Sequence, residues 1–226
     1  MKKRQINGHS FIAYQPGILD ENTMKEESML FLSKIKTRRS VRYFSKKDVP
    51  LEVINNIIET ASSAPSGANK QPWVFCVVKN TTIKKKIRQA AEKEEYASYH
   101  NRMNEDWLND LRPLGTNWEK PFLEEAPYLI VVFKKVYESG PDGNKKNNYY
   151  VNESVGLACG FLIAAIHMSG LAALTHTPSP MNFLTEILER PENERPFLLI
   201  PVGYPSEDCY VPDIERKKLD EVVKHY

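Results

Sequence analysis

Three arginines and a serine lie within five consecutive residues, Arg38-Arg39-Ser40-Val41-Arg42. The planar guanidinium of arginine presents a fork of donors that matches the oxygens of a phosphate group. A basic turn at the C-terminal end of a helix is also favoured by the helix dipole, without any ligand. On its own, this run therefore indicates either a phosphate site or a solvated helix end.

Two further segments combine turn-forming residues with polar groups. Residues 65–69 are Pro-Ser-Gly-Ala-Asn, and the glycine permits a backbone that directs its N–H groups toward a ligand. Residues 175–178 are Thr-His-Thr-Pro and follow an expected strand, where hydroxyls could donate to a ring nitrogen or a phosphate. Taken alone, residues 65–69 are better explained as an ordinary helix-to-strand loop, and the alternative for residues 175–178 is a strand end with turn-compatible residues.

Short motifs of the common catalytic classes are absent. The sequence has no GxSxG, HExxH, GxxxxGK[ST] or GxGxxG, so it predicts no nucleophile elbow, metal site or Rossmann dinucleotide fold. The cysteines number only three, and this odd, sparse count argues against a secreted disulfide framework and makes the reducing cytoplasm the expected compartment. An enzyme without such signals often relies on a bound cofactor for its chemistry.

Composition excludes several classes of protein. The 31 basic and 29 acidic side chains of the 226 residues give a net charge of +2, so nothing favours a nucleic-acid partner. The longest apolar stretch, residues 155–168, is shorter than the roughly 20 residues that cross a bilayer. No apolar segment of a signal peptide follows the polar start of the chain. We therefore expect a cytoplasmic protein without a membrane anchor.

The pattern of apolar residues predicts the elements that position these segments. Strands are expected at 73–78, 128–133, 171–175 and 197–202, and helices at 24–35, 50–61, 82–108, 150–169 and 181–188. The polar residues 138–148 are expected to form a loop. Since strands and helices follow each other without a regular βαβ repeat, we predict an α+β fold with helices covering a sheet. An N-terminal arm, residues 1–22, would precede one domain, residues 23–226.

Taken together, the three segments resemble the nitroreductase-like flavoprotein superfamily. The matching runs are RRSVRYF at 38–44, APSGANKQPWVF at 64–75 and THTP at 175–178. Within the superfamily the chain looks like the iodotyrosine deiodinases, on EEYASYHNRM at 94–103 and TNWEKPFLEEAP at 116–127. The resemblance implies a nitroreductase-like fold with a central mixed sheet, and an intertwined homodimer that holds FMN at its interface.

By the same resemblance, FMN is the cofactor and both chains contact it. The residues that the resemblance assigns to FMN, its phosphate included, are Arg38, Arg39, Ser40, Arg42, Pro65, Ser66, Gly67, Thr175, Thr177 and Arg216.

The resemblance also implies a clamp for the amino-acid end of a halotyrosine. Glu95 would pair with the substrate ammonium, while Tyr99 and Lys120 would reach its carboxylate, within a lid over about residues 92–122. A zwitterion needs partners of both charges, and Glu95 with Lys120 supplies them. Because Glu95 and Tyr99 are four residues apart, they would share one face of a helix. An ordinary surface pair with a distant lysine is the alternative interpretation.

The implied reaction is the FMN-dependent reductive dehalogenation of 3-iodotyrosine to tyrosine and iodide. In it, the backbone N–H of Ala68 would hold the substrate phenolate. The hydroxyl of Thr175 would donate to N5 of the flavin and favour single-electron steps over hydride transfer. His176, between the two threonines, is expected to be structural.

Three other functions remain open from the sequence. A general nitroreductase or quinone reductase using NAD(P)H would share the flavin motifs but would lack the clamp. A non-catalytic flavin-storage protein would bind FMN without turnover. A flavin-fragmenting enzyme would have no amino-acid substrate to hold.

Overall fold

The structure is a computed structural model that describes residues 2–15, 17–140 and 142–226. The chain forms two compact units, residues 1–37 and 38–226. The boundary at residue 37 lies after the first helix, whereas the sequence-based boundary near residue 22 would lie within it. The single FMN-binding domain expected over 23–226 and its lid over 92–122 stay predictions.

The first unit begins with a β-hairpin where the sequence analysis expected an arm of weak pattern. Strands β1 (Lys3–Ile6) and β2 (His9–Ile12) pair antiparallel around a two-residue turn. Asn7 and Gly8 occupy that turn with φ of 50° and 80°, and Asn-Gly is a strong hairpin signal. Helix α1 (Glu21–Lys36) follows, with the carboxylate of Asp20 accepting from two N–H groups of its first turn.

The second unit is built on a four-stranded sheet in the order β3 (Trp73–Val78), β4 (Tyr128–Lys135), β8 (Glu194–Gly203) and β7 (Ala172–Ala173). All of these strand pairs are antiparallel. Parallel pairing enters at an isolated bridge between Ser40 and Ala173 on the β7 edge. The predicted α+β class is confirmed.

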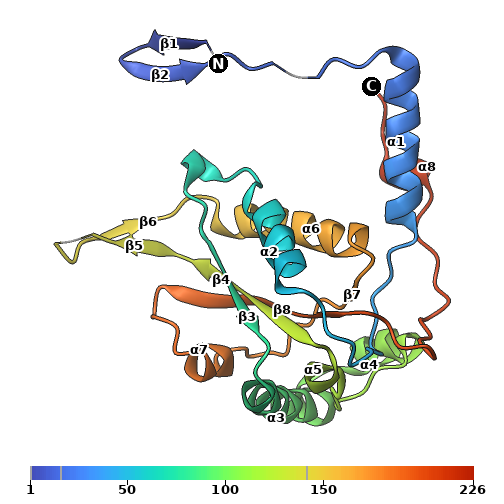
Figure 1. Cartoon of the computed structure of the whole chain (residues 1–226). Helices are drawn as coiled ribbons and strands as arrows, with labels where there is room; N and C mark the ends of the chain where they lie inside the picture. Colours follow the sequence, from blue (N-terminus) through green and yellow to red (C-terminus); the bar gives the residue numbers. More distant parts are fainter. Residues whose placement is uncertain (1, 16, 141) are drawn as a thin grey trace. The chain divides into compact units, whose positions relative to one another are not determined.

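Helices cover both faces of this sheet (Figure 1). Tyr128, Ile130 and Val132 of β4 are fully buried in the core that includes α2 and α6, while the intervening side chains face the opposite core. A strand that is buried on both faces reads as one continuous apolar run, as β4 does. The helices are α2 (Leu51–Ser62) and α6 (Val151–Met168) on the first face, and α3 (Thr81–Ala97), α5 (Phe122–Glu125) and α7 (Phe183–Ile187) on the other.

Shorter elements connect this framework. They are η1 (Gly67–Asn69), the π-helical turn η2 (Ser98–Arg102), α4 (Glu105–Leu111), η3 (Arg112–Leu114), β5 (Tyr137–Ser139), β6 (Lys145–Asn147) and α8 (Leu219–Val222). Strands β5 and β6 pair antiparallel, so the expectation of a loop over 138–148 is wrong. Their six residues are mostly polar and are partly or fully exposed. The sequence therefore shows no alternation of apolar residues that would mark these strands.

Helix α6 is longer than the apolar stretch that was read from the sequence. Among the described residues, α6 is the one helix that is long and apolar enough to cross a membrane, judged by length and composition alone. Its mean hydropathy is 1.4. However, Val155, Ala158, Leu162 and Ile166 of α6 are buried in the core against the sheet. One face of α6 therefore packs in the core, while 33% of the helix is buried.

Gly203, at the end of β8, allows the sheet to approach the segment before β4. A Cβ atom on Gly203 would lie 2.8 Å from Cγ of Pro127, inside van der Waals contact. We expect Gly203→Ala to lower the free energy of unfolding by about 1–3 kcal/mol, the usual cost of overpacking. The measurement is the urea midpoint of the purified protein. Gly17→Ala is the control, because no described atom lies within 4 Å of a Cβ atom at that position, and equal midpoints for both variants would contradict the prediction.

Candidate functional site

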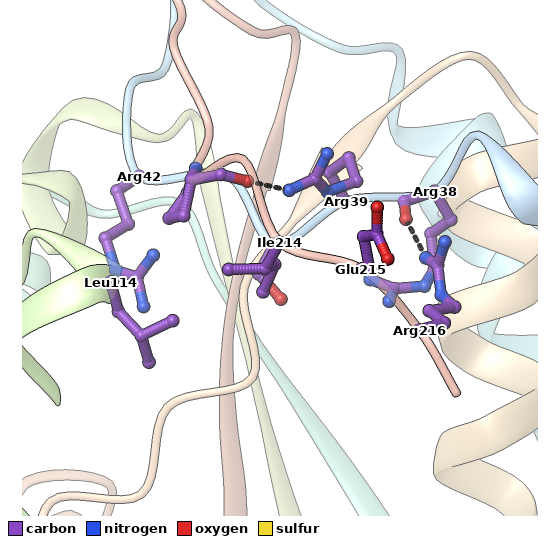
Figure 2. A pocket seen from close by; sticks show the side chains of 9 residues that line it. Arg38, Arg39, Arg42, Leu114, Ile214, Glu215 and Arg216 are labelled. Carbon is purple, nitrogen blue, oxygen red and sulfur yellow. Dashed lines mark hydrogen bonds between the residues drawn. The ribbon is translucent and has the colours of Figure 1, made fainter. Parts of the chain in front are cut away.

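Four arginines line one cavity of about 250 Å³ (Figure 2). Three come from the predicted run, Arg38, Arg39 and Arg42, and the fourth is Arg216 near the C-terminus. We call this the arginine cavity; its other lining residues are Ser40, Leu114, Pro212, Ile214 and Glu215. The structure thus brings together five of the residues that the sequence analysis assigned to the FMN phosphate and its surroundings.

Hydrogen bonds to backbone carbonyls hold the two segments of this cavity in place. The N–H of Val41 donates to the carbonyl of Ala173 at 3.1 Å, which fixes the arginine run beside the edge strand β7. The guanidinium of Arg39 donates to the carbonyl of Pro212, and that of Arg216 donates to the carbonyl of Arg38 at 2.7 Å. The C-terminal segment is therefore tied to the run by the same side chains that line the cavity.

The charges of the arginine cavity favour an anion. Burial lowers the pKa of Arg38, and the nearby charges of Arg216 and Arg39 lower it further. One carboxylate, that of the exposed Glu215, lies among the four guanidiniums. A phosphate group would offset the remaining repulsion and accept charge-assisted hydrogen bonds, so these residues fit the phosphate end of FMN.

A second cavity, of about 200 Å³, joins the expected clamp to the expected flavin residues. We call it the clamp cavity. Arg42 lines both cavities, which makes them neighbours. The complete lining of the clamp cavity is Arg42, Glu95, Tyr99, Met103, Trp107, Leu111, Thr116, Lys120, Phe122, Leu174, Thr175, His176 and Thr177.

Glu95 and Lys120 form a buried ion pair in this cavity. Nζ of Lys120 lies 3.3 Å from Oε2 of Glu95, and the Lys120 and Glu95 side chains are only 3% and 11% exposed respectively. Burial raises the pKa of Glu95 and lowers that of Lys120, while the attraction between the two charges opposes both shifts. The alternative interpretation, an ordinary surface pair of Glu95 and Tyr99 with a distant lysine, is therefore wrong.

The surroundings of Lys120 fix its position in the clamp cavity. Its backbone N–H donates to Oε1 of Glu92 at 2.7 Å, and its ammonium donates to the carbonyl of Asn117. The same ammonium lies 5.4 Å from the centre of the Tyr99 ring, within the range of a cation–π contact. Glu92 was not singled out from the sequence; its position one turn before Glu95 on α3 is the available signal.

Thr175, His176 and Thr177 continue from the edge strand β7 toward the clamp cavity. Thr175 and Thr177 are exposed and His176 is buried, as alternation along an extended chain requires. The N–H and carbonyl of His176 are both bonded to Leu199 of β8, at 2.9 and 3.0 Å. The two threonines are thus held on an anchored segment that lines the clamp cavity.

The loop that includes Pro65, Ser66, Gly67 and Ala68 does not line either cavity. It lies between α2 and β3, well away from α4 in Figure 1. The N–H of Gly67 donates to the hydroxyl of Ser154 at the start of α6, and Ala68 has a φ of 49°. One copy of the described chain therefore brings together two of the three expected segments, and the third stays a prediction.

Comparison with known proteins gives one family for most of the second unit. The profile described as "Nitroreductase family" matches residues 35–204. This range contains the arginine run, the sheet and the clamp cavity's expected residues.

Relatives of high similarity cover nearly the whole chain. An iodotyrosine deiodinase of Haliscomenobacter hydrossis is 60% identical over 96% of this chain and 98% of that protein. Iodotyrosine deiodinase 1 of Homo sapiens is 46% identical over 90% of this chain and 71% of that protein.

Solved structures agree with these relatives. A crystal structure of oxidised iodotyrosine deiodinase bound to FMN and 3-iodo-L-tyrosine has a TM-score of 0.75 at 33% identity, and the match covers 87% of this chain and 98% of that one. A nitroreductase with bound FMN from Bacteroides fragilis, at 21% identity, has a TM-score of 0.63 over 87% of this chain and 98% of that one, which supports the fold. The chain therefore belongs to the nitroreductase family and, within it, to the iodotyrosine deiodinases.

Proposed function

We propose that this protein uses FMN to remove halogen reductively from halotyrosines, converting 3-iodotyrosine to tyrosine and iodide. When bound in its reduced form, FMN would supply two electrons, which together with a proton replace the carbon–iodine bond by a carbon–hydrogen bond and release iodide. The observation that carries the proposal is the clamp cavity, where the buried Glu95–Lys120 pair lies with Thr175, Thr177 and Arg42. A general nitroreductase has no need for two opposite charges in this position.

The charges of the clamp match the amino-acid end of the substrate. Glu95 and Lys120 neutralise each other at 3.3 Å in the structure. A bound zwitterion can replace this pair by two pairs, with its ammonium on Glu95 and its carboxylate on Lys120 and Tyr99. The exchange keeps every charge compensated, which a buried site requires.

We assign the cofactor end of the site to the arginine cavity and the threonines. Arg38, Arg39, Arg42, Ser40 and Arg216 would hold the phosphate and the groups next to it. By the family resemblance, the hydroxyl of Thr175 would donate to flavin N5 and favour single-electron steps, with Thr177 beside it.

We further propose that the functional unit is a homodimer in which the loop of Pro65, Ser66 and Gly67 reaches the FMN of the partner subunit. The N–H of Ala68 would then hold the phenolate of the substrate there. In support, the two cavities of one chain are each smaller than the roughly 300–1,000 Å³ of typical ligand pockets, so the site needs further walls.

An apolar stripe of α6 is available for such an interface. Leu157, Phe161 and Met168 of this helix are each between 41% and 49% exposed. Their neighbours Gly156 and Gly160 have no described atom within 4 Å of a Cβ position. Small residues beside exposed apolar ones permit close packing of a second chain.

The compartment of the protein stays a prediction. The three cysteines, Cys76, Cys159 and Cys209, are free thiols in the structure, in keeping with the expected cytoplasmic location.

Turnover is tested anaerobically. The purified yellow protein is reduced with dithionite and mixed with 3-iodotyrosine, and flavin reoxidation and tyrosine are followed together. We expect rapid reoxidation with stoichiometric tyrosine. Absence of reoxidation, with fast reduction of a nitroaromatic by NADPH, would contradict the proposal and indicate a general nitroreductase.

Thr175→Ala is expected to keep FMN and slow the reoxidation of the flavin by 3-iodotyrosine. An unchanged rate would remove Thr175 from the mechanism.

The clamp is tested by Lys120→Met, which removes the ammonium and keeps the aliphatic stem. A charge-assisted hydrogen bond is worth about 1.5–3 kcal/mol, so kcat/KM for 3-iodotyrosine should fall about 10- to 100-fold. Reduction of a nitroaromatic should be unchanged. Lys93→Met, on an exposed position of α3, is the matched control and should behave as the wild type. If kcat/KM fell equally for 3-iodotyrosine and for the nitroaromatic, Lys120 would not be a selective clamp.

The arginine cavity is tested by Arg38→Met and by its control Arg195→Met, which removes an exposed guanidinium on β8. The loss of one charge-assisted phosphate contact should weaken FMN binding about 10- to 100-fold. Fluorescence titration of the apoprotein with FMN gives the dissociation constant. If riboflavin, which lacks the phosphate, is weakened as much as FMN, Arg38 does not hold the phosphate.

The shared site is tested by the mass in solution of the FMN-bound protein, measured by light scattering. A chain of 26.0 kDa should give twice this mass. A protein that stays at the mass of one chain while holding one FMN per chain would contradict the homodimer.

A further inference from the structure

No step of the proposed reaction uses the side chain of His176. It is only 8% exposed, and its Nε2 has no hydrogen-bond partner among the residues that the structure describes. A buried polar atom without a partner costs free energy comparable to a lost hydrogen bond, so proteins rarely keep one without a reason. The same residue lines the clamp cavity, which suggests that its partner is formed during substrate binding.

The carboxylate of Glu95 lies close to this nitrogen. Nε2 of His176 lies 3.9 Å from Oε1 of Glu95, while Oε2 of Glu95 lies 3.3 Å from the ammonium of Lys120. The two neighbours therefore lie on different oxygens of one carboxylate. A separation of 3.9 Å is too long for a hydrogen bond, but a side-chain movement of about 1 Å would close it.

The imidazole ring is fixed on its other sides. It packs edge-on against Phe122, with ring centres 5.6 Å apart and planes at 90°. Its backbone is bonded to Leu199 through both its N–H and its carbonyl. Because the ring is anchored while Glu95 lies at the end of a flexible side chain, closure of the gap would bring Glu95 toward His176.

His176 is uncharged in this environment. Burial lowers its pKa to about 3, and the charges of Lys120 and Arg42 contribute to this shift. A neutral imidazole has one N–H donor, and its tautomer is set by the group that can accept from it. With a carboxylate as the acceptor, His176 supplies a hydrogen bond to Glu95 without neutralising its charge.

We propose that His176 is a positioning residue for Glu95. His176 donates a hydrogen bond from Nε2 to the Glu95 carboxylate when Lys120 leaves that carboxylate for the substrate. This inference rests on the proposed function, since it requires the exchange of the Glu95–Lys120 pair by a zwitterion. When Lys120 turns to the substrate carboxylate, Glu95 loses its donor. The hydrogen bond from His176 then holds Glu95 in place to receive the substrate ammonium.

The test compares two amides at position 176. His176→Gln places an amide N–H near the position of Nε2, whereas His176→Asn carries its amide nearer the position of Nδ1. His176→Phe keeps a ring of similar shape and has no donor. If the phenylalanine variant fails to fold, the two amides still separate a donor near Nε2 from packing alone.

The measurement is the dissociation constant of each FMN-bound full-length variant, from the quenching of flavin fluorescence. The ligands are 3-iodotyrosine and 2-iodophenol, which has the same ring without the ammonium and the carboxylate. We expect His176→Phe and His176→Asn to weaken 3-iodotyrosine about tenfold, which is about 1.4 kcal/mol, and to leave 2-iodophenol unchanged. His176→Gln should recover most of the loss.

Other outcomes separate the inference from the proposed function. The role of His176 would be overturned if the phenylalanine and asparagine variants bound both ligands equally more weakly, or bound neither ligand more weakly. It would also be overturned if the glutamine variant bound 3-iodotyrosine no better than the asparagine variant. If the wild-type protein dehalogenates 3-iodotyrosine in either of these cases, the proposed function still stands. A wild-type protein that binds FMN but not 3-iodotyrosine would overturn both.

Discussion

The attachment of the arginine run to the edge of the sheet determines the arrangement of the whole site. The bridge between Ser40 and Ala173, with the N–H of Val41 donating to the carbonyl of Ala173, places this run beside the edge strand. The chain then continues from that strand to Thr175, so that Arg42 and Thr175 line one cavity. A loop by itself would not hold four cationic side chains together, because their charges repel each other and each gains by extending into water. The hydrogen bonds of the sheet edge offset this repulsion.

The buried ion pair of Glu95 and Lys120 illustrates a different compromise. Removal of two charges from water costs several kcal/mol per ion, and the attraction between them recovers this only when hydrogen bonds satisfy the remaining groups. The structure provides some of these bonds, from the Lys120 ammonium to the carbonyl of Asn117 and from the Lys120 backbone to Glu92. Two apolar side chains of similar volume in place of this ion pair would stabilise the folded protein as well. The buried pair is therefore best explained by function: each of its two charges can pair instead with the opposite charge of a bound zwitterion.

Much of the fold and of the site could be predicted from the sequence, and the exceptions have physical reasons. Buried strands such as Trp73–Val78 are continuous apolar runs, and their hydrophobicity identifies them without tertiary information. The hairpin of β5 and β6 was missed because its side chains are exposed and polar, so only backbone pairing marks it. The arginine run was found because closely spaced charged side chains are visible in the sequence, whereas the clamp was assigned by the family resemblance. The relation of His176 to Glu95 was not visible, because it joins residues far apart in the chain through the packing of α3 on the sheet. The separation of the loop of Gly67 from both cavities was not visible for the same reason.

The cluster of arginines also links the abundance of this protein to its cofactor. A ligand that binds only the folded chain adds to the free energy of unfolding in proportion to the logarithm of its concentration over its dissociation constant. Because the arginine cavity holds like charges near each other, the phosphate of FMN would contribute to folding as well as to chemistry. Proteases remove chains in proportion to the fraction that is unfolded. The flavin supply of the cell would therefore set how many copies of the protein persist, in addition to how many are active.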